Sequence, residues 1–94
     1  METKARVVLY SKPGCHLCEE MKAEMSKARC ADLYSLEEIN IESDAVLFAR
    51  YRFEIPVLWI NGVEAFKHRL LAEEFKAQVA AIVSRVRTSD SVEL

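Results

Sequence analysis

Two cysteines separated by two residues, Cys15 and Cys18, are the residues of this chain best suited to chemistry. They follow a stretch rich in β-branched and aromatic residues at 6–11 and a turn at 11–14, and they open a segment with helical spacing. A cysteine in the first turn of a helix has a stabilised thiolate, because unpaired backbone N–H groups and the helix dipole favour negative charge there. The second thiol lies one turn further on and can attack a disulfide formed by the first. This combination predicts dithiol redox chemistry.

The cysteine pair has two other interpretations that stay open at the level of the sequence. Both thiols could be inert core residues, or they could form half of a zinc or iron–sulfur site. A closed zinc site needs four ligands, and the remaining Cys and His residues, Cys30, His16 and His68, are scattered along the chain without a second C-x-x-C. We therefore assign no metal ligands. We expect Cys30 to be a structural thiol, with glutathionylation or an intermolecular disulfide as its alternative role.

Length and charge restrict the class of protein. The chain has 94 residues, 51% of them hydrophobic, which suffices for one small core. We expect a single domain at residues 1–87, a disordered polar tail at 88–94 and a monomer. The 13 basic and 15 acidic residues give a net charge of −2, which implies no general attraction to nucleic acid.

The first residues contain no apolar segment typical of a signal peptide, and no stretch approaches the length of a membrane span. We therefore expect a cytoplasmic protein without a membrane partner. Disulfides are rare as structural cross-links in that reducing compartment. A C-x-x-C pair there is better explained by catalysis or metal binding than by stabilisation of the fold.

The spacing of apolar residues predicts alternating strands and helices. The predicted elements are strands at 6–11, 33–41, 57–60 and 63–67, and helices at 15–29, 45–51 and 71–86. A helical crossover makes the first two strands parallel, and Asn61-Gly62 is a two-residue hairpin turn between the last two. The order is therefore β-α-β-α-β-β-α, which folds as an α/β domain with a four-stranded mixed sheet and helices on both faces.

Several further residues near the predicted strands have plain structural explanations. Tyr10, Phe53 and Trp59 are interpreted as core residues rather than substrate contacts. Arg50 and Arg52 are interpreted as the solvated end of the short helix, in keeping with the general exposure of charged side chains.

Two motifs give the chain a family resemblance. Residues 8–18 (VLYSKPGCHLC) resemble the strand, loop and helix that carry the active site in the glutaredoxin-like branch of the thioredoxin superfamily. Residues 51–58 (YRFEIPVL) resemble the segment that ends in a cis-proline opposite that site. The likeness covers residues 5–86 and is greatest to small bacterial glutaredoxin-like proteins with a Cys-His-Leu-Cys motif. It implies a thioredoxin-like fold.

The resemblance implies roles for the residues of the first motif. Cys15 would be the attacking thiolate and Cys18 the resolving thiol of a thiol–disulfide exchange. Lys12 would lower the free energy of the thiolate or contact a substrate carboxylate, as the matching lysine does in glutaredoxins, and its plain alternative is a solvated lysine. His16, between the two cysteines, favours the thiolate only while it is protonated.

The second motif concerns Ile55 and Pro56. The resemblance makes the bond between them cis, although trans is the commoner form of an X-Pro bond. The Ile55 backbone would then be free to pair with an extended substrate segment beside Cys15. Residues 65–69 depart from typical glutaredoxins, which carry a Gly-Gly pair followed by Asp that holds glutathione, because this stretch has no glycine and no acid. The thiols therefore predict the reaction better than they predict the substrate.

The resulting hypothesis is an enzyme, a thiol–disulfide oxidoreductase that reduces protein or glutathione mixed disulfides through Cys15 and Cys18. Its expected partners are a disulfide-containing protein or glutathione, and a thiol reductant. Glutathione is expected only as a co-substrate, and no covalently bound cofactor is expected. Two alternatives remain: an iron–sulfur or metal-binding module, and a thioredoxin-fold interaction domain whose thiols have lost their function.

Overall fold

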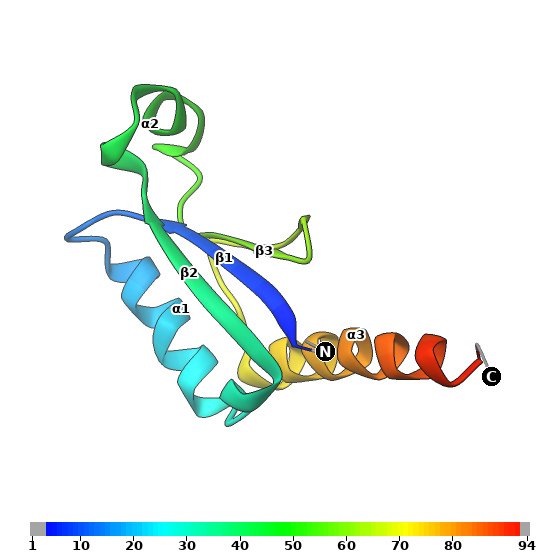
Figure 1. Ribbon diagram of the computed structural model, residues 1–94. Coiled ribbons are helices and arrows are strands. Elements are labelled where there is room, and N and C mark those ends of the chain that lie inside the picture. The colour runs from blue at the N-terminus through cyan, green and yellow to red at the C-terminus, as the bar shows by residue number, and fades with distance from the viewer. Residues whose placement is uncertain (1–3, 93–94) are drawn as a thin grey trace.

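The computed structural model of the chain describes residues 4–92, with side chains described up to residue 84. The strands are β1 (Ala5–Ser11), β2 (Tyr34–Asn40), β3 (Val57–Ile60) and β4 (Val63–Lys67), and the helices are α1 (His16–Lys27), α2 (Ala45–Tyr51) and α3 (Ala72–Val92) (Figure 1). Short 3₁₀ turns precede β2 and α2, at Ala31–Leu33 and Ile41–Ser43. The order β-α-β-α-β-β-α confirms the prediction from the sequence.

One mixed sheet organises the domain, with the strand order β2-β1-β3-β4. β1 and β2 are parallel, as the helical crossover through α1 requires, whereas β1 pairs antiparallel with β3, and β3 with β4. In the middle of β1, Leu9 lies opposite Glu38 of β2 and Leu58 of β3. β1 is thus a central strand, and it leads directly into the loop before α1.

The turn between β3 and β4 is the two-residue hairpin predicted from Asn-Gly. Asn61 and Gly62 both have left-handed backbones, with φ of 50° and 79°, a geometry in which Asn and Gly are the favoured residues. The Asn61 side chain also accepts a hydrogen bond from the backbone N–H of Arg6 at 2.7 Å. The turn is therefore tied to the start of β1.

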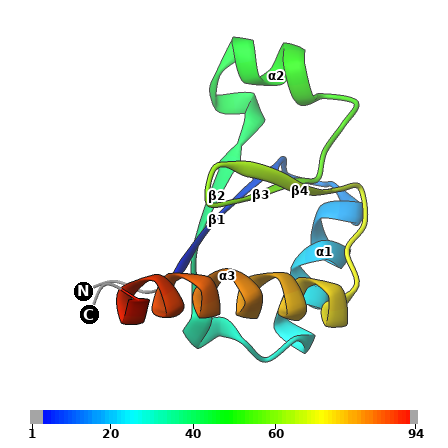
Figure 2. The ribbon, with the colours of Figure 1, turned by 90° about the vertical axis from the view of Figure 1, so that its right-hand side faces the viewer.

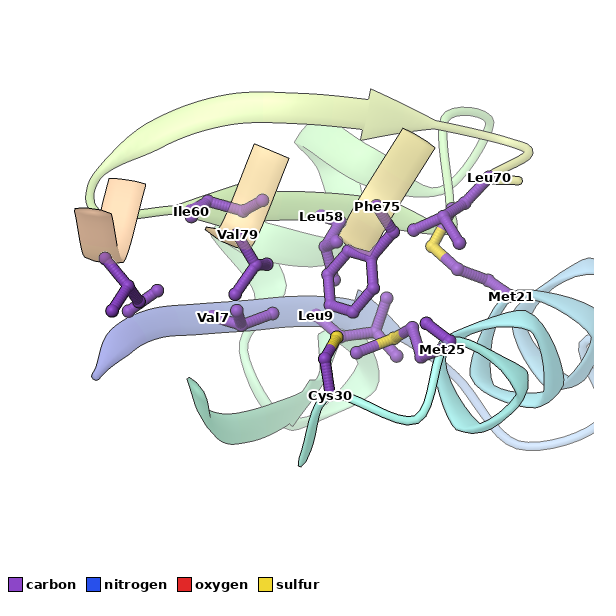
Figure 3. Packing of buried hydrophobic residues seen from close by; sticks show 13 residues of the cluster. Val7, Leu9, Met21, Met25, Cys30, Leu58, Ile60, Leu70, Phe75 and Val79 are labelled. Atoms are coloured by element: carbon purple, nitrogen blue, oxygen red, sulfur yellow. The ribbon is translucent and has the colours of Figure 1, made fainter. Parts of the chain in front are cut away.

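The main core lies between the sheet and the helices α1 and α3. Alternate residues of β1, among them Val7 and Leu9, are buried on this face. α3 contributes Phe75 and Val79, both fully buried, and Figure 3 shows them directed toward β1. Phe75 also meets the ring of Tyr34 edge to face, with centroids 5.2 Å apart. This one side chain therefore joins α3 to the start of β2.

The second face of the sheet is covered by α2 only at one end. Tyr51 of α2 stacks on Tyr10 of β1 with ring centroids 4.7 Å apart. Tyr51 also belongs to a smaller core with Ile41 and Val57. Figure 2 shows α2 on the opposite side of the sheet from α3, which confirms helices on both faces. Away from α2, this face is an open hollow of about 320 Å³ that Trp59 helps to line.

One of the three aromatic residues expected in the core lies outside it. Tyr10 and Trp59 are partly buried, but the side chain of Phe53 is 81% exposed. α2 ends at Tyr51, and it is Tyr51 that occupies the core position. The prediction for Phe53 was wrong because it depended on where a short helix ends and how the chain then turns.

α3 is longer than its apolar pattern predicts. The helix continues to Val92, whereas the apolar positions end at Val86. Because no Gly or Pro interrupts this stretch, nothing in the sequence stops the helix there. The helix thus enters residues 88–94, the segment in which we expected a disordered tail. Residues 93 and 94 lie outside the described residues. The domain boundary at residue 87 stays a prediction. Among residues 4–92, no helix is both long and apolar enough to cross a membrane.

Asp44 caps α2, and its removal gives a test of the fold. Its carboxylate accepts hydrogen bonds from the backbone N–H groups of Val46 at 2.8 Å and Leu47 at 3.2 Å. We expect Asp44→Ala to lower the free energy of unfolding by about 1 kcal/mol, because these N–H groups lose their acceptor. Urea unfolding followed by circular dichroism measures the loss. Asp44→Asn, which keeps a capping oxygen, is the matched control, and equal losses in the two variants would contradict the capping role.

Candidate functional site

The loop between β1 and α1 places Cys15 at the N-cap of α1. Gly14 precedes it with a left-handed backbone, at φ 77°, and the Cys15 backbone is extended. The Sγ of Cys15 accepts a hydrogen bond from the backbone N–H of Cys18 at 3.1 Å. The first turn of a helix presents unpaired N–H groups and the positive end of the helix dipole. Both favour a thiolate at this position once the pair is reduced.

A disulfide joins Cys15 to Cys18, and their Cα atoms lie 5.2 Å apart. The two residues differ in exposure, since Cys15 is partly buried whereas Cys18 is 1% exposed. Cys18 belongs to the smaller core together with Ile55 and Val57, and Cys15 packs against the same cluster. Cys15 is therefore the more accessible of the two to a group that arrives from outside.

The peptide bond between Ile55 and Pro56 is cis, as the family resemblance implied. Pro56 is fully buried and Ile55 lies in the cluster that contains Cys18, so the fold brings this segment to the cysteine pair. The expectation of a free Ile55 backbone was wrong for its N–H group, which donates to the Tyr51 carbonyl at 3.0 Å. The reason is that Arg52 keeps helical backbone angles after α2, and the resulting turn uses this N–H group.

The two basic residues predicted beside the cysteines lie in different surroundings. Lys12 is partly buried and helps to line a hollow of about 280 Å³ between the loop, α1 and β2. Glu19 and Glu38 line the same hollow. His16 is the first residue of α1 and is exposed. The assignment of Lys12 and His16 as substrate-binding residues stays a prediction.

The described residues do not offer a metal-binding cluster. Among them, no group of three or more His, Cys, Asp or Glu side chains is arranged to hold a metal ion. Cys30 lies in the main core, where burial raises the pKa of its thiol. A buried thiol with a raised pKa is a poor nucleophile, as we expected for a structural cysteine.

Comparison with known proteins decides the family. Residues 6–80 match the family described as Glutaredoxin-like domain (DUF836). The chain belongs to this family. A curated relative, the glutaredoxin-like protein YDR286C homolog of Dictyostelium discoideum, is 31% identical over 67 residues, which cover 65% of this chain and 62% of that protein. The chain therefore spans less than two thirds of the length of this relative.

Two solved structures resemble the glutaredoxin-like chain over most of its length. The X-ray structure of protein XcR50 from X. campestris is 25% identical with a TM-score of 0.67, and the match covers 80% of this chain and 96% of that one. The solution NMR structure of protein Ne2328 from Nitrosomonas europaea is 31% identical with a TM-score of 0.66, and covers 83% and 93%. With the disulfide between Cys15 and Cys18, these findings make the chain a redox-type protein of the thioredoxin fold.

A polar network lies behind the cysteine loop of this glutaredoxin-like domain. Ser11, the last residue of β1, is buried, and its hydroxyl donates a hydrogen bond to Glu38 at 2.7 Å. Lys22 on α1 pairs with Glu19 at 2.9 Å and with Glu38 at 3.1 Å. The Ser11 hydroxyl and Lys22 lower the pKa of the Glu38 carboxyl, while Glu19 and Glu38 raise the pKa of Lys22. The network therefore ties together β1, β2 and α1 where they meet the loop.

Analysis of the sequence did not find this network. The spacing of Glu19 and Lys22 on one helix face is visible in the sequence and is typical of an intrahelical ion pair. The bond between Ser11 and Glu38 is not visible there, because it joins residues 27 positions apart and depends on the register of β1 and β2.

Gly14 supplies the backbone geometry that the glutaredoxin-like loop needs before Cys15. A Cβ at this position would meet no atom within 4 Å, so the cost of a substitution comes from the left-handed backbone alone. We expect Gly14→Ala to lower the free energy of unfolding by about 1 kcal/mol. Urea unfolding of the oxidised protein measures this loss of free energy. Asn tolerates this backbone better, so Gly14→Asn should lose less, and an alanine variant as stable as the wild type would contradict the requirement.

Proposed function

We propose that this glutaredoxin-like chain is a thiol–disulfide oxidoreductase in which Cys15 is the nucleophile and Cys18 the resolving thiol. One observation carries the proposal. The Sγ of Cys15 lies at the N-cap of α1 and accepts the Cys18 N–H, while Cys18 itself is buried one turn along the helix. This arrangement supports a stabilised and accessible thiolate with a second thiol held within reach of it.

The reaction begins with the reduced pair. The Cys15 thiolate attacks one sulfur of a substrate disulfide, forms a mixed disulfide with it and releases the other sulfur as a thiolate. Cys18 then attacks the Cys15 sulfur, the bond to the substrate breaks, and the proton of the Cys18 thiol passes to the departing substrate thiolate. The substrate has gained two electrons, and the disulfide between Cys15 and Cys18 has formed. An external thiol reductant returns the pair to the reduced form by two further exchanges.

Protein disulfides are the better substrate class in this proposal, and glutathione mixed disulfides the poorer one. The family resemblance matches the stretch that holds glutathione through backbone N–H groups in typical glutaredoxins to residues 65–69, which are the end of β4 and the two residues after it. Here the N–H of His68 donates to the Pro56 carbonyl at 2.7 Å, and the N–H of Arg69 donates to the Lys67 carbonyl at 2.8 Å. Because both N–H groups are already bonded within the chain, they are not free to hold the tripeptide. Glutathione remains in the proposal as a co-substrate.

A reductase assay with two substrates tests the proposal. Insulin serves as the protein disulfide and a glutathione mixed disulfide as the small one, with dithiothreitol as the reductant. We expect the protein to accelerate insulin reduction above the rate of dithiothreitol alone, and to act less on the glutathione substrate. Protein alkylated with iodoacetamide after reduction is the control. Rates that equal the control for both substrates would overturn the proposed function. The cytoplasmic location and the monomeric state stay predictions.

A further inference from the structure

An exposed aromatic residue with arginines around it lies just before the cis-proline. Phe53 is 81% exposed, the largest exposed fraction of any large hydrophobic side chain in the part of the chain whose side chains are described. The neighbouring residues Phe48, Arg50 and Arg52 complete what we call the arginine–aromatic patch. Its arginines were interpreted above as no more than a solvated helix end.

The arginines of this patch are held by aromatic rings. The guanidinium carbon of Arg52 lies 5.0 Å from the ring centroid of Phe48 and 4.7 Å from that of Phe53. The guanidinium of Arg50 lies 5.2 Å from the ring centroid of Tyr51. Stacking of this kind restricts the side chain but leaves the N–H groups at the edge of the guanidinium plane free to bind a carboxylate with two hydrogen bonds.

The arginine–aromatic patch shares a buried core with the cysteine pair. Phe48 and Tyr51 pack into the same small core as Cys18, and Cys15 is partly buried against that core. Figure 2 shows the chain descending from the end of α2 to β3 on the side of the molecule where α1 begins. The patch and the cysteine pair are therefore anchored in one core, so a polypeptide whose disulfide is at Cys15 can extend toward the patch.

The charge of the patch favours an acidic partner. Within the part of the chain whose side chains are described, neither Arg50 nor Arg52 has a carboxylate oxygen within 4.0 Å, although the charge of Arg50 helps Lys67 to lower the pKa of the Glu54 carboxyl. Glu54, the residue after Phe53, forms an ion pair with Lys67 at 2.6 Å. The patch is thus locally positive although the whole chain has a net charge of −2. Within a Debye length of about 10 Å the local charge decides the interaction.

We propose that the arginine–aromatic patch recognises an acidic polypeptide segment next to the disulfide of a protein substrate. Its carboxylates pair with Arg50 and Arg52, and an apolar side chain of the same segment covers Phe53. This inference rests on the proposed function, because it names the class of disulfide that is brought to Cys15. A nucleic acid is the poorer candidate, since the 13 basic residues are outnumbered by 15 acidic ones and the chain carries net negative charge.

Two synthetic peptides test the proposal. Each contains the same intramolecular disulfide and one Leu beside it, flanked by Asp and Glu in the first peptide and by Lys in the second. We expect kcat/KM to be about fivefold higher for the acidic peptide, since two exposed ion pairs contribute modestly. The double variant Arg50→Gln/Arg52→Gln should lose this preference, and Phe53→Ser should slow both peptides. The preference should also fall at high salt.

Lys76→Gln is the control for loss of positive charge away from the patch, because Lys76 lies on α3 on the opposite side of the sheet, and this variant should keep the preference. Equal kcat/KM for the two peptides in the wild type would overturn the proposal while leaving the reductase function intact. If neither peptide nor any other disulfide is reduced, the reductase function fails.

A binding measurement tests the patch even in that case. It uses fluorescence anisotropy with labelled peptides that carry Ser in place of both cysteines. Tighter binding of the acidic peptide to the wild type than to the double variant supports the proposed role of the patch. Equal binding, or equally tight binding of a single-stranded DNA oligonucleotide, overturns it.

Discussion

Cys15→Ser is expected to reduce turnover of a protein disulfide to the rate of the chemical reductant alone, the largest effect on activity that we predict. A serine hydroxyl keeps its proton at neutral pH and cannot form a disulfide, so the first exchange is lost. The fold around it should persist, because serine is itself a favoured N-cap residue and can accept the bond that the Cys15 Sγ accepts from Cys18. Insulin reduction measures the activity, and circular dichroism checks that the variant is folded.

Cys18→Ser should behave differently. Cys15 still attacks the substrate, but nothing resolves the mixed disulfide, so a covalent adduct accumulates. Mass spectrometry without reductant measures it as the mass of the protein plus one substrate molecule. Cys30→Ser is the control, since Cys30 lies in the main core and should not affect turnover. An adduct on the Cys15→Ser variant, or full activity in both variants, would contradict the assigned roles.

The elements of the fold could be predicted because their signals are local. The bounds of α2, β3 and β4 agree with the apolar pattern and its flanking breaks. Asn61-Gly62 forms the predicted hairpin turn, because few other residue pairs adopt its left-handed backbone so readily. The position of Cys15 at the start of α1 followed in the same way, from a turn and a helical pattern on either side of it.

The surroundings of the cysteines could be predicted only in part, because they depend on contacts between distant segments and on how α2 ends. The cis bond at Pro56 came from the family motif and not from the residues themselves. Residues 52–54 form a turn after α2. This turn leads to the hydrogen bond from the Ile55 N–H to the Tyr51 carbonyl and to the exposure of Phe53. No periodicity of apolar residues encodes that turn. The network around Glu38 needed the register of two strands.

The largest effect on stability is expected for Phe75→Ala, a loss of about 3–5 kcal/mol in the free energy of unfolding. Phe75 is 0% exposed and projects from α3 toward Leu9 at the centre of the sheet (Figure 3). Removing its ring loses the free energy of burial and leaves a cavity whose lining has no partner atoms. Urea unfolding of the oxidised protein measures the loss, so that the disulfide is the same in wild type and variant.

Phe53→Ala is the matched control for this substitution, since the same ring is removed from an exposed position. It should lose less than about 1 kcal/mol, the range of an exposed cation–π contact such as that with Arg52. Equal losses would contradict the placement of the core. Phe75 belongs to the main core and Cys18 to the smaller one. The folded fraction of Phe75→Ala should therefore keep its reductase activity, and a folded but inactive variant would mean that β1 couples the two cores.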